Sequence, residues 1–291
     1  MARKRSVSSK SRSKKKLTPV SILILVLEIV FIVALIQVLR IMLGYMNADS
    51  SYDSLTESMQ AVELTIFPSE TTSGTDETLT AVEAEAEETE ETNETVTYSY
   101  SITVPDFDYL SSINDDVIGW IQIPGTAVNY PIVQGDDNDY YLTHLYTGET
   151  SSSGAIFLDS GTTLGLEDRN AIIFGHNMKN GSMFAALNSY SSSGYYSLHP
   201  YVVVTDLSGT RYIYDIFAVY TVDTANEEES VSVYLHGFGA DENFAAYLET
   251  VQGLSIYSTG ISVTQDDYII TLSTCKNANS TVRTIVQAVR R

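Results

Sequence analysis

The sequence predicts a mostly β domain, a closed or nearly closed β-barrel with helical additions, behind an N-terminal membrane helix and an acidic linker. Three observations lead to this prediction. Short apolar runs separated by Gly, Asn, Asp and Ser recur from Val117 to the end of the chain. One long apolar segment lies near the N-terminus. Acidic and polar residues fill the region between the two.

The N-terminal segment has the pattern of a signal anchor. Residues 1–18 are strongly basic, and residues 19–39 are mostly apolar and long enough to cross a bilayer as a helix. No basic residue follows Arg40 until Arg169, so the positive-inside rule places the basic tail in the cytoplasm and the rest outside. We expect an uncleaved transmembrane anchor over residues 19–43. A cleaved signal peptide is the alternative, but it would have a shorter apolar region and a better cleavage site.

Residues 44–97 are rich in Glu, Thr and Ser and end in AVEAEAEETEETNETVT. Such a composition buries too little apolar surface to fold and repels itself, so we predict an acidic disordered stalk. A local acidic helix over residues 80–90 is compatible with this interpretation. The charge also excludes nucleic acid as a general partner. Beyond residue 40 the chain holds seven basic and 36 acidic residues, whereas nucleic acids bind cationic surfaces.

The folded domain is expected to span residues 98–291. It opens with a short helix in DFDYLSS, and apolar runs at 117–123 and 128–133 flank a Pro-Gly turn. Residues 241–255 have apolar side chains at helical spacing, which predicts one helix before the last two strands. The remaining predicted strands are GAIFLD, NAIIFGH, YVVVTDL, RYIYDIFAVYTV, YIITLSTC and VRTIVQAV.

Cys275 is the only cysteine, so the chain has no internal disulfide and the thiol is either buried filler or a reagent. A nucleophilic thiolate needs a base or a cation beside it. Of the histidines at 144, 176, 199 and 236, His176 is the best placed, because it leaves the run NAIIF after a glycine, much as Cys275 leaves YIITLST. His144 is the alternative source of an imidazole. Two groups at strand ends can face each other across one rim of a barrel.

Arg283 follows Cys275 by eight positions, inside the run TVRTIVQAV. Because side chains alternate between the two faces of a strand, its guanidinium can project away from a strand whose apolar side chains pack in the core. A cation at this point could stabilise an oxyanion or hold a peptide carbonyl. An ordinary surface arginine is the competing interpretation, although basic residues are scarce in this part of the chain.

Three long motifs resemble one family. TLSTC at 271–275 matches the Thr-Leu-x-Thr-Cys signature of sortases, and FGHNMKNGSMF at 174–184 resembles the histidine segment of the class B branch. GWIQIPGTAVNYPIVQGDDNDYYLTHLYTG at 119–148 is similar to the first strands of that branch. The resemblance covers the chain from about residue 98 to its end. It implies a sortase-type closed β-barrel with an N-terminal helix and an extra helix before the cysteine strand.

The resemblance also implies roles for single residues. It assigns the catalytic histidine to His176, the nucleophile to Cys275 and the arginine to Arg283. Weaker candidates, for substrate binding, are the neighbouring Asn177, Ser273 and Thr274.

Two positions in the same motifs are not expected to act in catalysis. His144 lies in a shared motif outside the family's catalytic set, so we expect it to be structural. Asn277 stands where some class B members have an acidic residue, so no catalytic carboxylate is predicted there. We expect no metal ion and no cofactor.

The implied function is that of a membrane-anchored cysteine transpeptidase. It would cleave an Asn-Pro-x-Thr-like sorting signal of secreted proteins after the threonine, form a thioester, and pass the acyl group to a peptidoglycan precursor amine. A pilus-polymerising class B sortase, which uses a pilin lysine as acceptor, is the alternative. The implied location is the cell membrane of a Gram-positive type envelope, single-pass, with the N-terminus cytoplasmic and the catalytic domain extracellular.

Two functions of other classes compete with this interpretation. A papain-like cell-wall peptide hydrolase would place its cysteine before its histidine, whereas here His176 precedes Cys275. A membrane-tethered binding barrel without activity would need no reactive thiol.

Overall fold

The computed structural model describes residues 19–66, 98–226, 233–277 and 280–291. The chain divides into two compact units, Met1–Leu43 and Gly44–Arg291. The long helix α1 (Pro19–Ser58) contributes residues to both. By length and composition α1 is able to cross a membrane, and it is the one such helix among the described residues.

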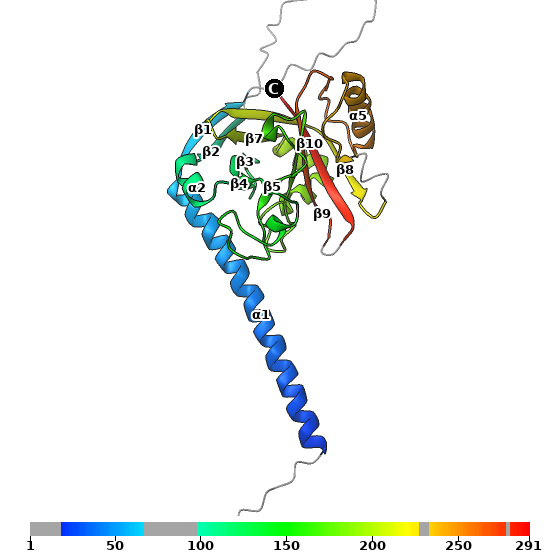
Figure 1. Cartoon of the computed structure of the whole chain (residues 1–291). Helices are drawn as coiled ribbons and strands as arrows, with labels where there is room; N and C mark the ends of the chain where they lie inside the picture. Colours follow the sequence, from blue (N-terminus) through cyan, green and yellow to red (C-terminus); the bar gives the residue numbers. More distant parts are fainter. Residues whose placement is uncertain (1–18, 67–97, 227–232, 278–279) are drawn as a thin grey trace, which may run out of the picture. The chain divides into compact units, whose positions relative to one another are not determined.

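The second unit is built around a closed barrel of eight strands (Figure 1). Hydrogen-bonded neighbours follow the order β10-β8-β7-β3-β4-β5-β6-β9, and β9 closes the barrel against β10. The pairs β4–β5 and β6–β9 are parallel, and the others are antiparallel. The predicted mostly β, closed-barrel fold is therefore confirmed. The strands are β3 (Val117–Gln122), β4 (Asn129–Val133), β5 (Ile156–Leu158), β6 (Asn170–Phe174), β7 (Tyr201–Asp206), β8 (Arg211–Asp223), β9 (Ile269–Cys275) and β10 (Val282–Arg290).

Helix α5 (Asp241–Leu254) covers the outer face of part of the barrel and confirms the helix predicted before the cysteine strand. Its buried side chains recur at the spacing of one helical face. They pack on Ile285 and Val289 of β10 and on the outward side chains of β8. Because α5 buries this outer face while the core fills the inside, these strands are apolar on both faces. The buried residues of α5 are Phe244, Tyr247, Leu248 and Val251.

Short helices connect the strands. Helix α2 (Phe107–Ile113) begins after Asp106, whose carboxylate accepts a hydrogen bond from the Tyr109 amide (3.0 Å) and so caps the first turn. The others in the described part of the chain are α3 (Ser193–Leu198) and the 3₁₀ helices η1 (Tyr140–Leu142), η2 (Gly165–Glu167) and η3 (Ala185–Ser191).

The predicted disordered stalk is wrong over residues 44–66. Helix α1 continues to Ser58, and β1 (Gln60–Ile66) pairs antiparallel with β2 (Tyr98–Val104) (Figure 1). A few apolar residues at helical spacing, including Tyr52 and Leu55, are enough to bury one face of this helix in the barrel core. The acidic composition of the wider region makes these residues hard to recognise from the sequence. Residues 67–97 of the predicted stalk, and the basic tail at 1–18, lie outside the described residues.

Candidate active site

Strand register brings the three predicted catalytic positions to one rim of the barrel. Parallel pairing of β6 with β9 sets Phe174 opposite Ser273, so His176 and Cys275 each lie two residues beyond a paired position. Antiparallel pairing of β9 with β10 sets Cys275 opposite Arg283. Residues separated by about a hundred positions in the sequence therefore meet because of the barrel topology.

A groove with a volume of about 390 Å³ lies at this rim, and all three predicted catalytic residues line it. Its remaining wall combines apolar side chains with a few polar groups, as is usual for a binding site. The apolar part comes from Leu142, Phe157 and Phe174, with Gly175 beside them. The polar part comes from Asn138, Thr224, Tyr234, Ser273 and Thr274.

The imidazole of His176 is held by the backbone. Its Nε2 lies 2.7 Å from the carbonyl oxygen of Leu142. Because a carbonyl only accepts, Nε2 carries the hydrogen, which leaves Nδ1 of the neutral ring as an acceptor. Gly175 allows the strand to leave the barrel here, since a Cβ at this position would meet the Phe184 ring at 2.8 Å.

Cys275 is a free, partly buried thiol at the end of β9. The strand end is fixed through its backbone. The Cys275 carbonyl accepts a hydrogen bond from Asn188 Nδ2 (3.2 Å), and the next carbonyl, of Lys276, accepts one from Asn177 Nδ2 (3.2 Å). Thr274 Oγ1 donates to the Gly175 carbonyl (2.8 Å) and so ties the cysteine strand to the histidine strand.

The three weaker candidates for substrate binding occupy different places. Ser273 and Thr274 are buried and line the groove. Asn177 is not among the lining residues; it forms a bridge with Met183 and holds the Lys276 carbonyl, so it stabilises the two strand ends.

Arg283 is the second residue of β10, and its partly buried side chain lines the groove. One guanidinium nitrogen, Nη1, donates to the Ser280 carbonyl (2.6 Å). A guanidinium has five N–H donors in a rigid plane, so this bond fixes its orientation and leaves donors for a ligand.

Tyr234 is a groove residue that the sequence did not reveal. Its hydroxyl lies 2.8 Å from Ser273 Oγ, and its ring packs beside Phe174 with centroids 5.6 Å apart. Burial raises the pKa of Tyr234, while the hydrogen bond with Ser273 and the charge of Arg283 act against that rise. The hydroxyl is therefore neutral near pH 7 and can donate as well as accept.

A buried polar network fixes the segment that carries Tyr234. Tyr247 of α5 donates its hydroxyl to the Val233 carbonyl (2.9 Å), and Asn170 Nδ2 donates to the Leu235 carbonyl (2.8 Å). The residues on both sides of Tyr234 are thus anchored to the barrel and to α5. The network is completed by Thr271 and Gln287, which bond to Asn170 and Tyr247.

A second set of contacts joins the segment after Tyr234 to Asn138 of the groove wall. His236 Nε2 lies 3.5 Å from Asp159 Oδ1, and the other oxygen of Asp159 accepts from Asn138 Nδ2 (2.8 Å). Asn138 is itself part of the groove wall. No sequence pattern points to these contacts, because they join short segments far apart in the chain.

His176 is the one histidine of the chain that lines the groove. His144 stacks on Tyr140, with ring centroids 4.0 Å apart, and its Nδ1 lies 2.8 Å from the Tyr140 carbonyl. Nδ1 of His199 lies 2.9 Å from the Pro124 carbonyl. Within the described residues no group of three or more His, Cys, Asp or Glu side chains is arranged to hold a metal ion.

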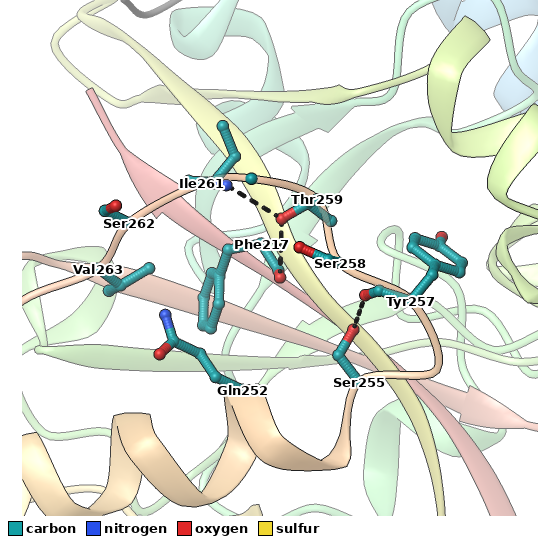
Figure 2. Close-up of a pocket in the computed structure, with 10 residues that line it drawn as sticks. Phe217, Gln252, Ser255, Tyr257, Ser258, Thr259, Ile261, Ser262 and Val263 are labelled. Carbon is teal, nitrogen blue, oxygen red and sulfur yellow. Dashed lines mark hydrogen bonds between the residues drawn. The ribbon is translucent and has the colours of Figure 1, made fainter. Parts of the chain in front are cut away.

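A larger cavity, of about 570 Å³, lies elsewhere, between the end of α5, strand β8 and the segment after α5 (Figure 2). Hydrogen bonds fix its wall: Ser255 Oγ donates to the Tyr257 carbonyl (2.8 Å) and Thr259 Oγ1 to the Phe217 carbonyl (3.0 Å). Among the described residues that line it there is no Cys, His, Arg, Lys, Asp or Glu. Size alone therefore does not identify the reactive site, and the smaller groove at Cys275 is the better candidate.

A closed barrel with a single thiol, an imidazole and a guanidinium at one rim is the arrangement expected of an enzyme with a cysteine nucleophile. Comparison with known proteins names the family: residues 121–291 match the model of the sortase domain. The chain belongs to the sortase family.

Relatives and solved structures agree with this assignment. Sortase B of Listeria monocytogenes is 41% identical over 167 residues, which cover 57% of this chain and 65% of that protein. Sortase B of Staphylococcus aureus is 32% identical over 187 residues, which cover 63% of this chain and 74% of that protein. The chain thus spans slightly less than two thirds of the Listeria relative. A solved Staphylococcus aureus sortase B–substrate complex superposes with a TM-score of 0.58 at 31% identity, covering 64% of this chain and 84% of that one.

Proposed function

We propose that this protein is a cysteine transpeptidase of the class B sortase type, with Cys275 as nucleophile, His176 as general acid and base, and Arg283 as the cation that holds the substrate carbonyl. The observation that carries the proposal is the convergence of these three side chains on one groove of about 390 Å³. Its polar groups are few and lie among apolar ones, which suits an extended peptide whose scissile carbonyl must be placed accurately.

The first half of the reaction forms a thioester. The Cys275 thiolate attacks the carbonyl carbon of the threonine in the sorting signal, and the carbonyl oxygen becomes an oxyanion beside the Arg283 guanidinium. As the C–N bond breaks, protonated His176 gives a proton from Nδ1 to the leaving amine. The Nε2 hydrogen bond to the Leu142 carbonyl keeps the ring in place during this step.

The second half transfers the acyl group. An amine of a peptidoglycan precursor attacks the thioester, neutral His176 removes a proton from that amine, and the C–S bond breaks to restore the thiolate. One group must be protonated and the other ionised at the start, so we expect kcat/KM to rise and then fall with pH. The proposed substrates are secreted proteins with an Asn-Pro-x-Thr-like signal.

The cell membrane is the proposed location. Helix α1 is long and apolar enough to span it, and the basic residues before it favour a cytoplasmic N-terminus. The barrel would then lie outside, where secreted substrates and lipid-linked acceptors are found. The proposed organisation is a basic tail, an anchor over residues 19–43 and a catalytic unit that begins close after the membrane.

Mass spectrometry and peptide cleavage test this function together. The full chain in detergent micelles should cleave a fluorescent Asn-Pro-x-Thr peptide, and a covalent acyl adduct should map to Cys275. An added amine should increase turnover and appear in the product. Cys275→Ala should abolish adduct and cleavage, and His176→Ala should abolish cleavage while leaving a thiol that still alkylates slowly. Cleavage that survives in Cys275→Ala would refute the assignment.

A further inference from the structure

The part of α1 that belongs to the barrel unit is linked to His176 through a short series of contacts with residues around that histidine. Residues 44–58 fold with the barrel as one compact unit. On this stretch Ala48, Tyr52 and Leu55 are at most 5% exposed and join the same core cluster as the barrel strands. The helix is therefore a fixed part of the folded unit.

The first contact runs through Tyr52. Its ring packs edge-on against Tyr130, with centroids 5.0 Å apart, and its hydroxyl donates to the Gly154 carbonyl (3.3 Å). Gly154 forms a wall directly behind His176, since a Cβ at position 154 would lie 3.0 Å from His176 Cδ2. The φ of +57° at Gly154 also requires glycine. Tyr52 thus supports the surface on which the imidazole rests.

The second contact runs through Asp49. Both of its carboxylate oxygens accept from Asn180 Nδ2, at 2.8 and 3.1 Å. Asn180 lies in the loop that follows His176, and this loop is closed where the Phe184 amide donates to the His176 carbonyl (2.9 Å). Asp49 therefore fixes the far side of the same loop.

Tyr130 joins the two contacts. Its hydroxyl accepts from the Met183 amide (2.9 Å), and Met183 has a φ of +56°, a strained value for a residue with a side chain. Because Tyr52 packs on Tyr130, the helix supports the loop at this point as well. A loop with a strained residue keeps its shape only when its surroundings fix it.

We propose that Asp49 and Tyr52 are positioning residues for His176, so that the helix directly after the membrane anchor is part of the catalytic apparatus. The inference rests on the proposed role of His176 in proton transfer. A displacement of about 1 Å in a reacting group costs on the order of a hundredfold in rate, so partial loosening of the loop should lower kcat without weakening peptide binding. Neither residue touches the groove itself.

The test uses the full chain in detergent micelles, four single variants and the double variant Asp49→Ala/Tyr52→Phe. Tyr52→Phe removes the hydroxyl and keeps the ring, and Asp49→Ala removes the acceptor for Asn180. Asp49→Asn keeps one carbonyl oxygen to accept from Asn180 and should restore most of the activity. Asp53→Ala is the matched control: this residue is exposed, lies one turn further along the same helix and makes no side-chain hydrogen bond among those described.

We expect the double variant Asp49→Ala/Tyr52→Phe to lose about ten- to fiftyfold in kcat, with KM within twofold of the parent. Asp53→Ala should match the parent. A melting curve for each variant separates positioning from loss of fold. Parental kcat in the folded double variant would overturn the proposal, and so would a loss of activity that merely follows the fraction of unfolded protein.

Alkylation of Cys275 by iodoacetamide gives a readout that needs no peptide substrate. The rate depends on the thiolate and on the protonation of His176 beside it, with Tyr234 and Arg283 as the other ionisable groups that line the groove. The double variant should show a pH dependence different from that of the parent and of Asp53→Ala. An unchanged profile would overturn the positioning role, even if the parent cleaved no peptide. Absence of cleavage by the parent would instead refute the proposed function.

Discussion

Replacement of Arg283 by lysine separates a directed guanidinium from a simple positive charge. Arg283 uses Nη1 to donate to the Ser280 carbonyl (2.6 Å), and its remaining donors are available to a ligand in the groove. Lysine has one nitrogen on a flexible chain, so it keeps the charge but not two fixed directions of donation. The variant should lose one charge-assisted hydrogen bond to the oxyanion, about 2.7 kcal/mol, or about a hundredfold in kcat/KM.

The effect on folding should be small. Arg283 is partly buried at the start of β10, and the bond that it gives up contributes about 1 kcal/mol, which corresponds to roughly 2–4 °C in Tm for a domain of this size. Cleavage of a fluorescent sorting peptide, with and without an amine acceptor, measures the first quantity, and a melting curve measures the second.

Arg290→Lys provides the matched control for this experiment. Arg290 ends the same strand, lies 4.2 Å above the Tyr268 ring and does not line the groove. Its variant should cleave at the parental rate. Near-parental turnover in Arg283→Lys would show that a point charge is sufficient, and the directed role argued for the guanidinium would then be refuted.

Three further predictions concern the folded unit. A chain that begins at Gly44 should be soluble and folded. A chain that begins at Tyr98 should melt at a lower temperature, because it lacks Tyr52, Leu55 and β1. Equal melting temperatures would contradict the packing of the helix against the barrel. Tyr247→Phe should cost about 1–3 kcal/mol in urea unfolding, since the Val233 carbonyl loses the hydroxyl donor and the side-chain amides of Asn170 and Gln287 each lose one of their two acceptors. An unchanged midpoint would contradict that account. Burial raises the pKa of Tyr247 to about 12 and also raises the pKa values of other tyrosines, so the folded protein keeps protons that the unfolded chain releases above about pH 10. The free energy of unfolding should therefore fall above that pH by about 1.4 kcal/mol per pH unit for each such tyrosine. Constant stability between about pH 9 and 11 would disprove this.

The barrel strands and the reactive positions were readable from the sequence because both depend on local pattern. Short apolar runs with polar breaks predicted the strands, helical spacing at residues 241–255 predicted α5, and the positions of His176 and Cys275 after two buried runs predicted a shared rim. The roles of these residues in catalysis remain predictions.

Features made by long-range contacts were not readable in the same way. Tyr234 lines the groove because Tyr247 and Asn170 form hydrogen bonds with the residues beside it. Local sequence pattern does not predict which backbone carbonyl a side chain distant in the sequence will bind. The disorder predicted for residues 44–66 is wrong because that prediction depends on average composition, which does not detect a few apolar side chains spaced along one helical face.

Parallel pairing of β6 with β9 has a consequence for the stage of folding at which the proposed site is assembled. About a hundred residues separate the two strands, so closure of this pair is a slow, late step compared with the formation of hairpins. Until then the chain holds Cys275 and His176 apart, since the barrel topology is what brings them to one rim. If the two residues act as proposed, an incompletely folded chain has no working site, and pairing of β6 with β9 is the folding step that completes it.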